Sequence, residues 1–153
     1  MKIKVYTDGS CRGNPGPGGW GAVILYDDKE IKLANQVKLT TNQQMELLAA
    51  AQALEYIEHN ITNCQTFGPE IILYTDSAYL YNCWKDEWWK RWVWNGWLNT
   101  KKEPVANKLY WESLIPWFKN SNFTVIKVKG HTDNKYNNLA DLLATGIVAP
   151  TDS

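Results

Sequence analysis

The hydrophobic pattern of the chain changes at Thr41, and this change restricts the fold more than any other feature. Three segments before Thr41 have the alternating or continuous apolar pattern of strands: residues 2–7, 20–26 and 31–37. Their short connections predict an antiparallel meander. After Thr41 the period is helical as far as about His59, with Thr41 as the cap and Gln44 at the reciprocal capping-box position.

A glycine- and proline-rich segment, residues 13–19, separates the first two strands. We expect it to be neither helix nor strand, and we expect the first strand to end in a turn at Asp8-Gly9. The segment lacks the Gly-Lys-Ser/Thr ending of a nucleotide-binding P-loop and leads into a strand, which argues against nucleotide binding by that route. A tight structural turn and a close approach of the backbone to a ligand remain as interpretations.

The second half of the chain alternates strands and helices. Residues 70–75 form a continuous apolar run, typical of a central parallel strand, and Ser77 is placed to cap the next helix. An aromatic and basic helical segment follows at 84–97. Three further elements are predicted: a helix from Pro104 through Phe118 that Pro116 kinks or shortens, a strand over 124–129, and a helix over 138–145 that Gly146 ends. This order predicts an α/β fold in which helices flank a mixed sheet.

Length and composition limit the function classes. The chain has 153 residues, 44% of them hydrophobic, which predicts one domain over residues 1–148 and a short tail over 149–153. Lys and Arg balance Asp and Glu at 16 each, so phosphates would have to be bound by a local patch or by metal ions. The chain has no apolar run of membrane-spanning length and no signal-peptide core, so a cytoplasmic protein without membrane contact is expected. Three widely spaced cysteines argue against a disulfide framework or a zinc ribbon.

Four acidic residues are candidates for a shared site. Asp8 and Asp76 follow apolar strands, at the ends where α/β sheets place reactive groups, although either one alone equally suits a turn. Glu46 projects from the apolar stripe of its helix, with alanines at i+3, i+4 and i+7, and no nearby lysine is an obvious partner. Asp141 shows a weaker form of the same conflict in the last helix.

If these four carboxylates converge, about two divalent cations are needed to offset their charge, and oxygen ligands suit Mg²⁺ or Mn²⁺. A pair of such ions serves phosphodiester hydrolysis, so the residues predict metal-assisted phosphoryl transfer. His131 follows a strand and precedes Asp141 by ten residues, where it could carry protons, although a lone histidine is more often structural. His59 is expected to be a solvated residue at a helix end.

Four motifs occur in the order and at the spacing of one known family: residues 7–10 with 13–22, residues 41–46, residues 74–77, and residues 128–131 up to Asp141. With them the chain resembles type 1 ribonuclease H of the bacterial kind over nearly its whole length. The resemblance implies a ribonuclease H-like fold with a five-stranded mixed sheet, three antiparallel strands followed by two parallel ones. It also implies an endonuclease that hydrolyses the RNA strand of RNA/DNA hybrids and leaves 3′-hydroxyl and 5′-phosphate ends.

The resemblance assigns roles to individual residues. The metal-binding acids match Asp8, Glu46, Asp76 and Asp141, which would hold two Mg²⁺ ions with substrate, and the family's mobile loop histidine matches His131. The residues that reach the minor groove of the hybrid, where 2′-hydroxyls mark the RNA strand, match Asn14, Asn42 and Gln43. A pocket for a DNA phosphate matches Thr41 and Asn107, and the aromatic positions of the substrate-handling protrusion match Trp88 and Trp92. A monomer is expected.

Several positions depart from the family. Val93, Trp94 and Asn95 stand where basic residues are common, which predicts weaker and less salt-sensitive hybrid binding. Leu39 replaces an Arg that often assists the phosphate pocket. Asp133 and Asn138 alter the histidine loop. The helical spacing of Trp88 and Trp92 also suits packing inside the protein.

Two other functions remain open at this stage. The diluted basic protrusion and the altered loop would suit a module that binds hybrids without cleaving them. A nuclease of broader substrate range would also cut double-stranded RNA. Four crowded acids favour an enzyme, because binding alone gives no reason to tolerate them.

Overall fold

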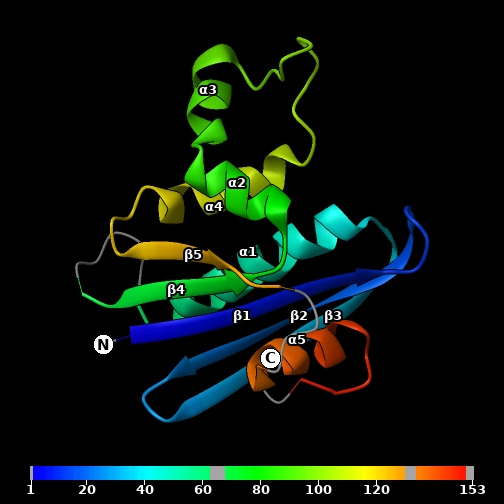
Figure 1. The fold of residues 1–153 in the computed structure, drawn as a ribbon, viewed down its shortest axis with the longest axis vertical. Helices are drawn as coiled ribbons and strands as arrows, with labels where there is room; N and C mark the ends of the chain where they lie inside the picture. The colour runs from blue at the N-terminus through cyan, green and yellow to red at the C-terminus, as the bar shows by residue number, and fades with distance from the viewer. Residues whose placement is uncertain (1, 63–67, 130–133, 151–153) are drawn as a thin grey trace.

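A mixed five-stranded sheet forms the centre of the structure in the part of the chain that is described. The computed structural model describes residues 2–62, 68–129 and 134–150. The strand order is β3-β2-β1-β4-β5, and β1 (Lys2–Cys11), β2 (Gly16–Tyr26) and β3 (Lys29–Thr40) pair antiparallel. Next to β1, β4 (Glu70–Thr75) and β5 (Phe123–Lys127) continue the sheet in parallel (Figure 1). The predicted α/β fold, with three antiparallel strands followed by two parallel ones, is confirmed.

Helices cover both faces of this sheet (Figure 1). On one face α1 (Asn42–Asn60) packs against the β1 residues Ile3 and Val5. On the other face α5 (Lys135–Ala144) packs against Tyr6 and Val23. Because side chains alternate along a strand, β1 contributes to both cores and its C-terminal end lies between the two helices.

The glycine-rich segment is partly strand, contrary to the prediction. β1 does not end at Asp8-Gly9 but continues to Cys11, and β2 already begins at Gly16. A Cβ atom on Gly19 would lie 2.3 Å from the Ala144 carbonyl oxygen of α5. Glycine in these strands therefore allows a helix backbone to pack directly on the sheet, and it does not mark a loop.

Helix α1 begins at the predicted position. The hydroxyl oxygen of Thr41 accepts a hydrogen bond from the backbone N–H of Gln44 at 3.2 Å. The Gln44 side chain accepts a bond from the Thr40 hydroxyl at 3.0 Å. Thr41 is therefore the predicted cap, whereas Gln44 fixes the end of β3 and has no reciprocal bond to the cap residue among the bonds described.

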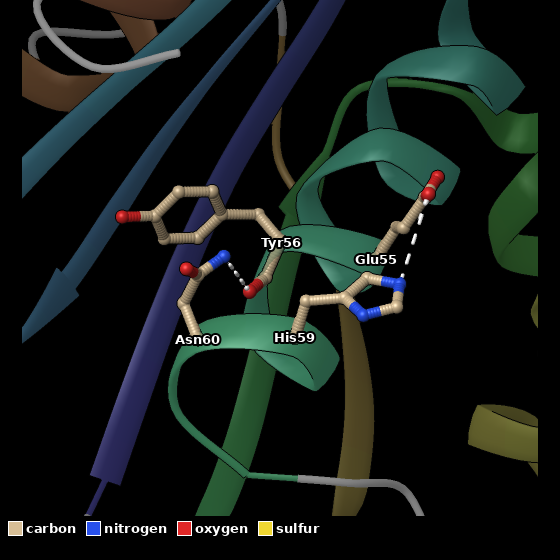
Figure 2. Close-up of polar contacts among 4 residues, drawn as sticks. All are labelled: Glu55, Tyr56, His59 and Asn60. Atoms are coloured by element: carbon tan, nitrogen blue, oxygen red, sulfur yellow. Dashed lines mark hydrogen bonds and ion pairs between the residues drawn. The ribbon is translucent and has the colours of Figure 1, made fainter.

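The C-terminal turn of α1 is exposed and polar. His59 Nε2 lies 3.9 Å from the Glu55 carboxylate, one turn earlier, and both side chains face solvent (Figure 2). The Asn60 side-chain amide donates a hydrogen bond to the Tyr56 carbonyl oxygen at 2.9 Å (Figure 2). His59 is therefore the solvated helix-end residue that the sequence predicted.

Three helices lie between β4 and β5 along the chain. They are α2 (Ala78–Lys85), capped by Ser77 as predicted, α3 (Trp88–Asn95), and α4 (Lys108–Phe118). The predicted start of the third helix is wrong. Pro104 forms a bridge with Leu98, and the segment folds back on itself before α4 begins. Pro116 does not break α4, which ends two residues later.

The last helix, in contrast, starts earlier than predicted, at Lys135 instead of 138. The Asn134 side chain accounts for this difference, because its oxygen accepts hydrogen bonds from the backbone N–H groups of Tyr136 and Asn137. Gly146 follows α5 with φ of 83°, as expected for a residue that ends a helix.

Two predictions made from composition can be compared with the structure. In the residues that the structure describes, no helix is long and apolar enough to cross a membrane. Cys11 and Cys83 are both free thiols, and Cys64 lies outside the described residues.

Candidate active site

Three carboxylates meet at the C-terminal ends of β1 and β4. Asp8 lies on β1, Asp76 directly follows β4, and Glu46 lies near the start of α1. One carboxylate oxygen from each lies within 4.8 Å of the others. β1 and β4 are parallel neighbours, so their C-terminal ends lie at the same edge of the sheet. The fold therefore brings together acids that lie far apart in the sequence.

Gly9 allows Glu46 to reach this position. A Cβ atom on Gly9 would lie 2.6 Å from the backbone nitrogen of Glu46 and 2.7 Å from the carbonyl carbon of Met45. Real side chains do not tolerate such distances, so only glycine lets α1 rest on β1 at this point. The backbone N–H of Gly9 also donates a hydrogen bond to the Asp8 carboxylate at 2.9 Å.

The surroundings of Asp8 and Glu46 disfavour the charged form of both. Burial, followed by the charges of Asp76 and Asp141, raises the pKa of Asp8 to about 8. Burial is also the main cause that raises the pKa of Glu46 to about 7, with a smaller contribution from Asp76. At neutral pH the site without a metal therefore holds protons that a cation would displace.

Ser77 is a site residue that the sequence analysis treated only as a helix cap. Its hydroxyl oxygen accepts the backbone N–H of Leu80 at 3.1 Å, which confirms the cap. The same hydroxyl bonds to the Glu46 carboxylate and lowers the Glu46 pKa against the larger effect of burial. Ser77 is almost completely buried, so its hydroxyl is held at the base of the acidic site. The position of Ser77 directly after Asp76 was the available sequence signal.

Asp141 approaches the site from the opposite side. It is exposed on α5 and is not among the three mutually close carboxylates, but its carboxyl group hydrogen-bonds to that of Asp8. Asp8, Asp76 and Asp141 line one pocket together with Lys129 and Asn138. The sequence analysis did not identify Lys129 as part of this pocket. Lys129 follows β5 and belongs to no hydrophobic pattern that would have indicated a site residue.

The donor set fits a hard divalent cation. Carboxylate oxygens are the ligands that Mg²⁺ and Mn²⁺ prefer. Oδ1 of Asp76 is buried and has no hydrogen-bond partner among the described residues, although the side chain as a whole reaches solvent. A buried acceptor without a donor is costly, and a bound cation would satisfy it.

The structure places some of the predicted substrate residues around the N-terminus of α1. The Asn14 side-chain oxygen accepts a hydrogen bond from the backbone N–H of Asn42 at 3.0 Å, so the short connection between β1 and β2 lies against the start of the helix. Asn42 and Gln43 are exposed in its first turn, directly after Thr41. His131 lies outside the described residues.

Trp88 and Trp92 belong to a cluster of aromatic rings. The Trp92 ring centroid lies 6.2 Å from that of Trp88, 5.9 Å from Trp97 and 5.6 Å from the fully buried Trp111. Both are half-buried against the core, so the alternative of internal packing describes their main contacts. Trp94 is 86% exposed on the same helix. Asn107 is half-buried before α4, with a left-handed φ of 63°.

The sheet order and the acidic site define a metal-dependent nuclease of the ribonuclease H-like class. A family model described as RNase H matches residues 1–148, and the chain belongs to this family.

Individual relatives agree with this placement. The chain is 45% identical over 148 residues to ribonuclease H of Moorella thermoacetica, covering 97% of this chain and 92% of that protein. Among solved structures, the chain is similar to LC9-RNase H1, which is a type 1 RNase H with the type 2 active-site motif. The TM-score is 0.77 and the sequence identity is 25%, and the match covers 99% of this chain and 77% of that one. LC11-RNase H1, solved in complex with RNA/DNA hybrid, shares the fold with a TM-score of 0.69, 22% identity and coverage of 94% of each chain.

Proposed function

We propose that this chain is a metal-dependent endoribonuclease that hydrolyses the RNA strand of RNA/DNA hybrids and leaves 3′-hydroxyl and 5′-phosphate ends. The observation that carries the proposal is the convergence of Asp8, Glu46 and Asp76 in a chain of the RNase H family. A hybrid as substrate agrees with the complex solved for LC11-RNase H1.

The carboxylates are proposed to hold two Mg²⁺ ions with substrate, or Mn²⁺ in their place, with Asp141 as the fourth ligand. The bound ions would supply Lewis-acid stabilisation and a water of lowered pKa. Asp8, Glu46 and Asp76 would bind and orient the ions, and Ser77 would hold Glu46 in position. His131 is proposed to move a proton near the scissile phosphate.

The other assignments carry over as proposals. Three polar residues around the N-terminus of α1 would contact 2′-hydroxyls in the minor groove: Asn14, Asn42 and Gln43. Thr41 and Asn107 would bind a DNA phosphate, and Trp88 with Trp92 would support the protrusion that handles the substrate. We also propose that residues 1–148 act as one catalytic domain in a monomer.

The experiment that tests the function compares three duplexes in parallel, each with a labelled RNA strand where RNA is present: RNA/DNA hybrid, double-stranded RNA and double-stranded DNA. Each is incubated with Mg²⁺, Mn²⁺ or a chelator. We expect cleavage of the hybrid RNA strand alone, with both metals and not with the chelator. Tight hybrid binding without any cleavage would instead indicate a binding module, and cleavage of double-stranded RNA would indicate the broader nuclease.

Replacing Gly9 with Ala is expected to lower hybrid cleavage by more than about ten-fold. The new methyl group would meet the α1 backbone, so α1 must move and carry Glu46 away from Asp8. Overpacking of this kind costs about 1–3 kcal/mol in the free energy of unfolding. Initial rates and urea unfolding measure the two effects. Wild-type rates in Gly9→Ala would show that the position of Glu46 does not depend on this contact.

A further inference from the structure

A second polar pocket lies next to the acidic site, further along β1 and α5. Its lining includes two β1-side residues, Ser10 and Arg12, the β2 glycines Gly18 and Gly19, and Gln36 with Thr145. None of these residues belongs to the acidic pocket that contains Asp8 and Asp141.

The same two elements form the walls of both pockets. Asp8 and Ser10 lie on one face of β1, because side chains alternate along a strand. The backbone N–H of Arg12 donates to the Pro17 carbonyl oxygen at 2.7 Å, so the pairing with β2 continues one residue beyond β1. Thr145, the C-cap residue directly after α5, follows Asp141 by about one helical turn, which places both on one side of the helix.

The distance between the two pockets is short. Two strand residues advance about 7 Å, and one helical turn advances about 5.4 Å. The β2 surface between them is covered by the backbone of α5, because a Cβ atom on Gly21 would lie 2.5 Å from the Ala140 carbonyl oxygen and one on Gly19 would meet Ala144. Arg12 lies beyond the acidic site along β1, four residues or about 13 Å from Asp8.

The charge of this second pocket suits an anion. Arg12 is exposed and forms no ion pair among the described residues. The carbonyl groups at the C-terminal end of α5 would repel an anion if they were free, but they are occupied. The Gln36 amide donates to the Ala144 carbonyl at 3.1 Å, and the Thr145 hydroxyl donates to Leu142 at 3.1 Å.

We infer that Arg12 holds a phosphate of the RNA strand, one to two nucleotides from the bond that is cleaved. A guanidinium binds phosphate oxygens through two parallel hydrogen bonds. The RNA strand is the occupant because its scissile phosphate must lie at the carboxylates, and Arg12 lies directly beyond the end of the strand that carries Asp8. This inference rests on the proposed function. Arg12 would be a positioning residue in a chain with no net positive charge.

The first test measures hybrid binding by fluorescence anisotropy over a range of KCl concentrations, in an Asp76→Asn background that preserves the substrate. Replacing Arg12 with Ala is expected to weaken binding about three- to ten-fold and to reduce the slope of log affinity against log salt by about 0.7–0.9, as for one lost phosphate contact. In the otherwise wild-type enzyme, KM should rise while kcat stays within two-fold. Lys29→Ala is the matched control, because Lys29 is an exposed cation at the opposite end of β2.

A second variant separates charge from packing. Arg12→Gln keeps much of the side-chain stem and removes the charge, so it should reproduce the loss in affinity and salt slope. A loss that occurs in the Ala variant and not in the Gln variant would overturn the phosphate contact.

The strand is identified with hybrids that carry a single neutral methylphosphonate at successive positions. Neutralising the phosphate that Arg12 contacts should remove the effect of Arg12→Ala, and we expect this at one RNA position near the cleavage site. Coupling on the DNA strand alone, or at no position, overturns the inference. If the wild-type enzyme cleaves hybrids and Arg12→Ala behaves as Lys29→Ala does, the inference fails while the proposed function stands. If no hybrid is cleaved, the proposed function fails first.

Discussion

Replacing Asp8 with Asn is expected to reduce hybrid cleavage by at least about a thousand-fold, which corresponds to ~4 kcal/mol of transition-state stabilisation. Asn has nearly the shape of Asp but lacks one anionic oxygen, so the variant weakens cation binding at the point where three carboxylates lie within 4.8 Å. The fold should persist, because the ionised Asp8 is disfavoured in the protein without metal. Hybrid affinity in chelator should stay nearly equal, because Asp8 is largely protonated in the metal-free site at neutral pH and Asn is likewise uncharged.

The measurement pairs initial cleavage rates with hybrid affinity by fluorescence anisotropy. Asp28→Asn is the matched control. It makes the same substitution in the exposed turn between β2 and β3, at the opposite end of β2 from the site, and should retain wild-type activity. More than about a tenth of the wild-type rate in Asp8→Asn would mean that Asp8 does not bind the catalytic metal.

The elements with a strong local pattern could be predicted from the sequence. β4 was predicted to the residue, because an apolar run ending at a polar residue is a local signal. Glu46 could be selected as a site residue for a similar reason, since its helical neighbours Ala49, Ala50 and Ala53 are all buried and leave a carboxylate on the packed face. Burial of that face is the physical cause of both the signal and the raised pKa.

The predictions that failed depend on contacts between distant parts of the chain. The strand segment Gly16–Gly19 pairs with β1 and β3, and at Gly19 the backbone of α5, more than a hundred residues later, packs directly on it. The late start of α4 follows from the bridge between Leu98 and Pro104. Ser77 has a second role because the hydroxyl that caps α2 also faces Glu46 of another helix. Local periodicity contains no information on such contacts.

The stability of the metal-free protein is expected to fall as pH rises. The pKa of Asp8 is raised to about 8 and that of Glu46 to about 7, above the ordinary values of 3.8 and 4.5. The folded state therefore binds more protons than the unfolded state, and the associated stability is complete only below the unfolded pKa values. It is lost progressively as pH rises from the unfolded pKa values to about 7 and 8. Between pH 5 and pH 9 we expect a loss of several kcal/mol in the free energy of unfolding.

Magnesium should reverse this trend, because a cation binds the deprotonated carboxylates and competes with protons. In urea unfolding, the stabilisation by Mg²⁺ should therefore be larger at pH 8.5 than at pH 5.5.

Glu46→Gln removes one of the two titrations, so in chelator at pH 8.5 this variant should be at least as stable as the wild type, gain less from Mg²⁺, and still lose most of its activity. Glu55→Gln makes the same change on the exposed side of α1 and should behave as the wild type does, since a surface pair with His59 contributes little. If Glu46→Gln strongly destabilised the protein in chelator, Glu46 would stabilise the fold itself, and burial would not disfavour its carboxylate in the metal-free site. If wild-type stability in chelator rose between pH 5.5 and 8.5, the acidic cluster would not be protonated in the metal-free protein.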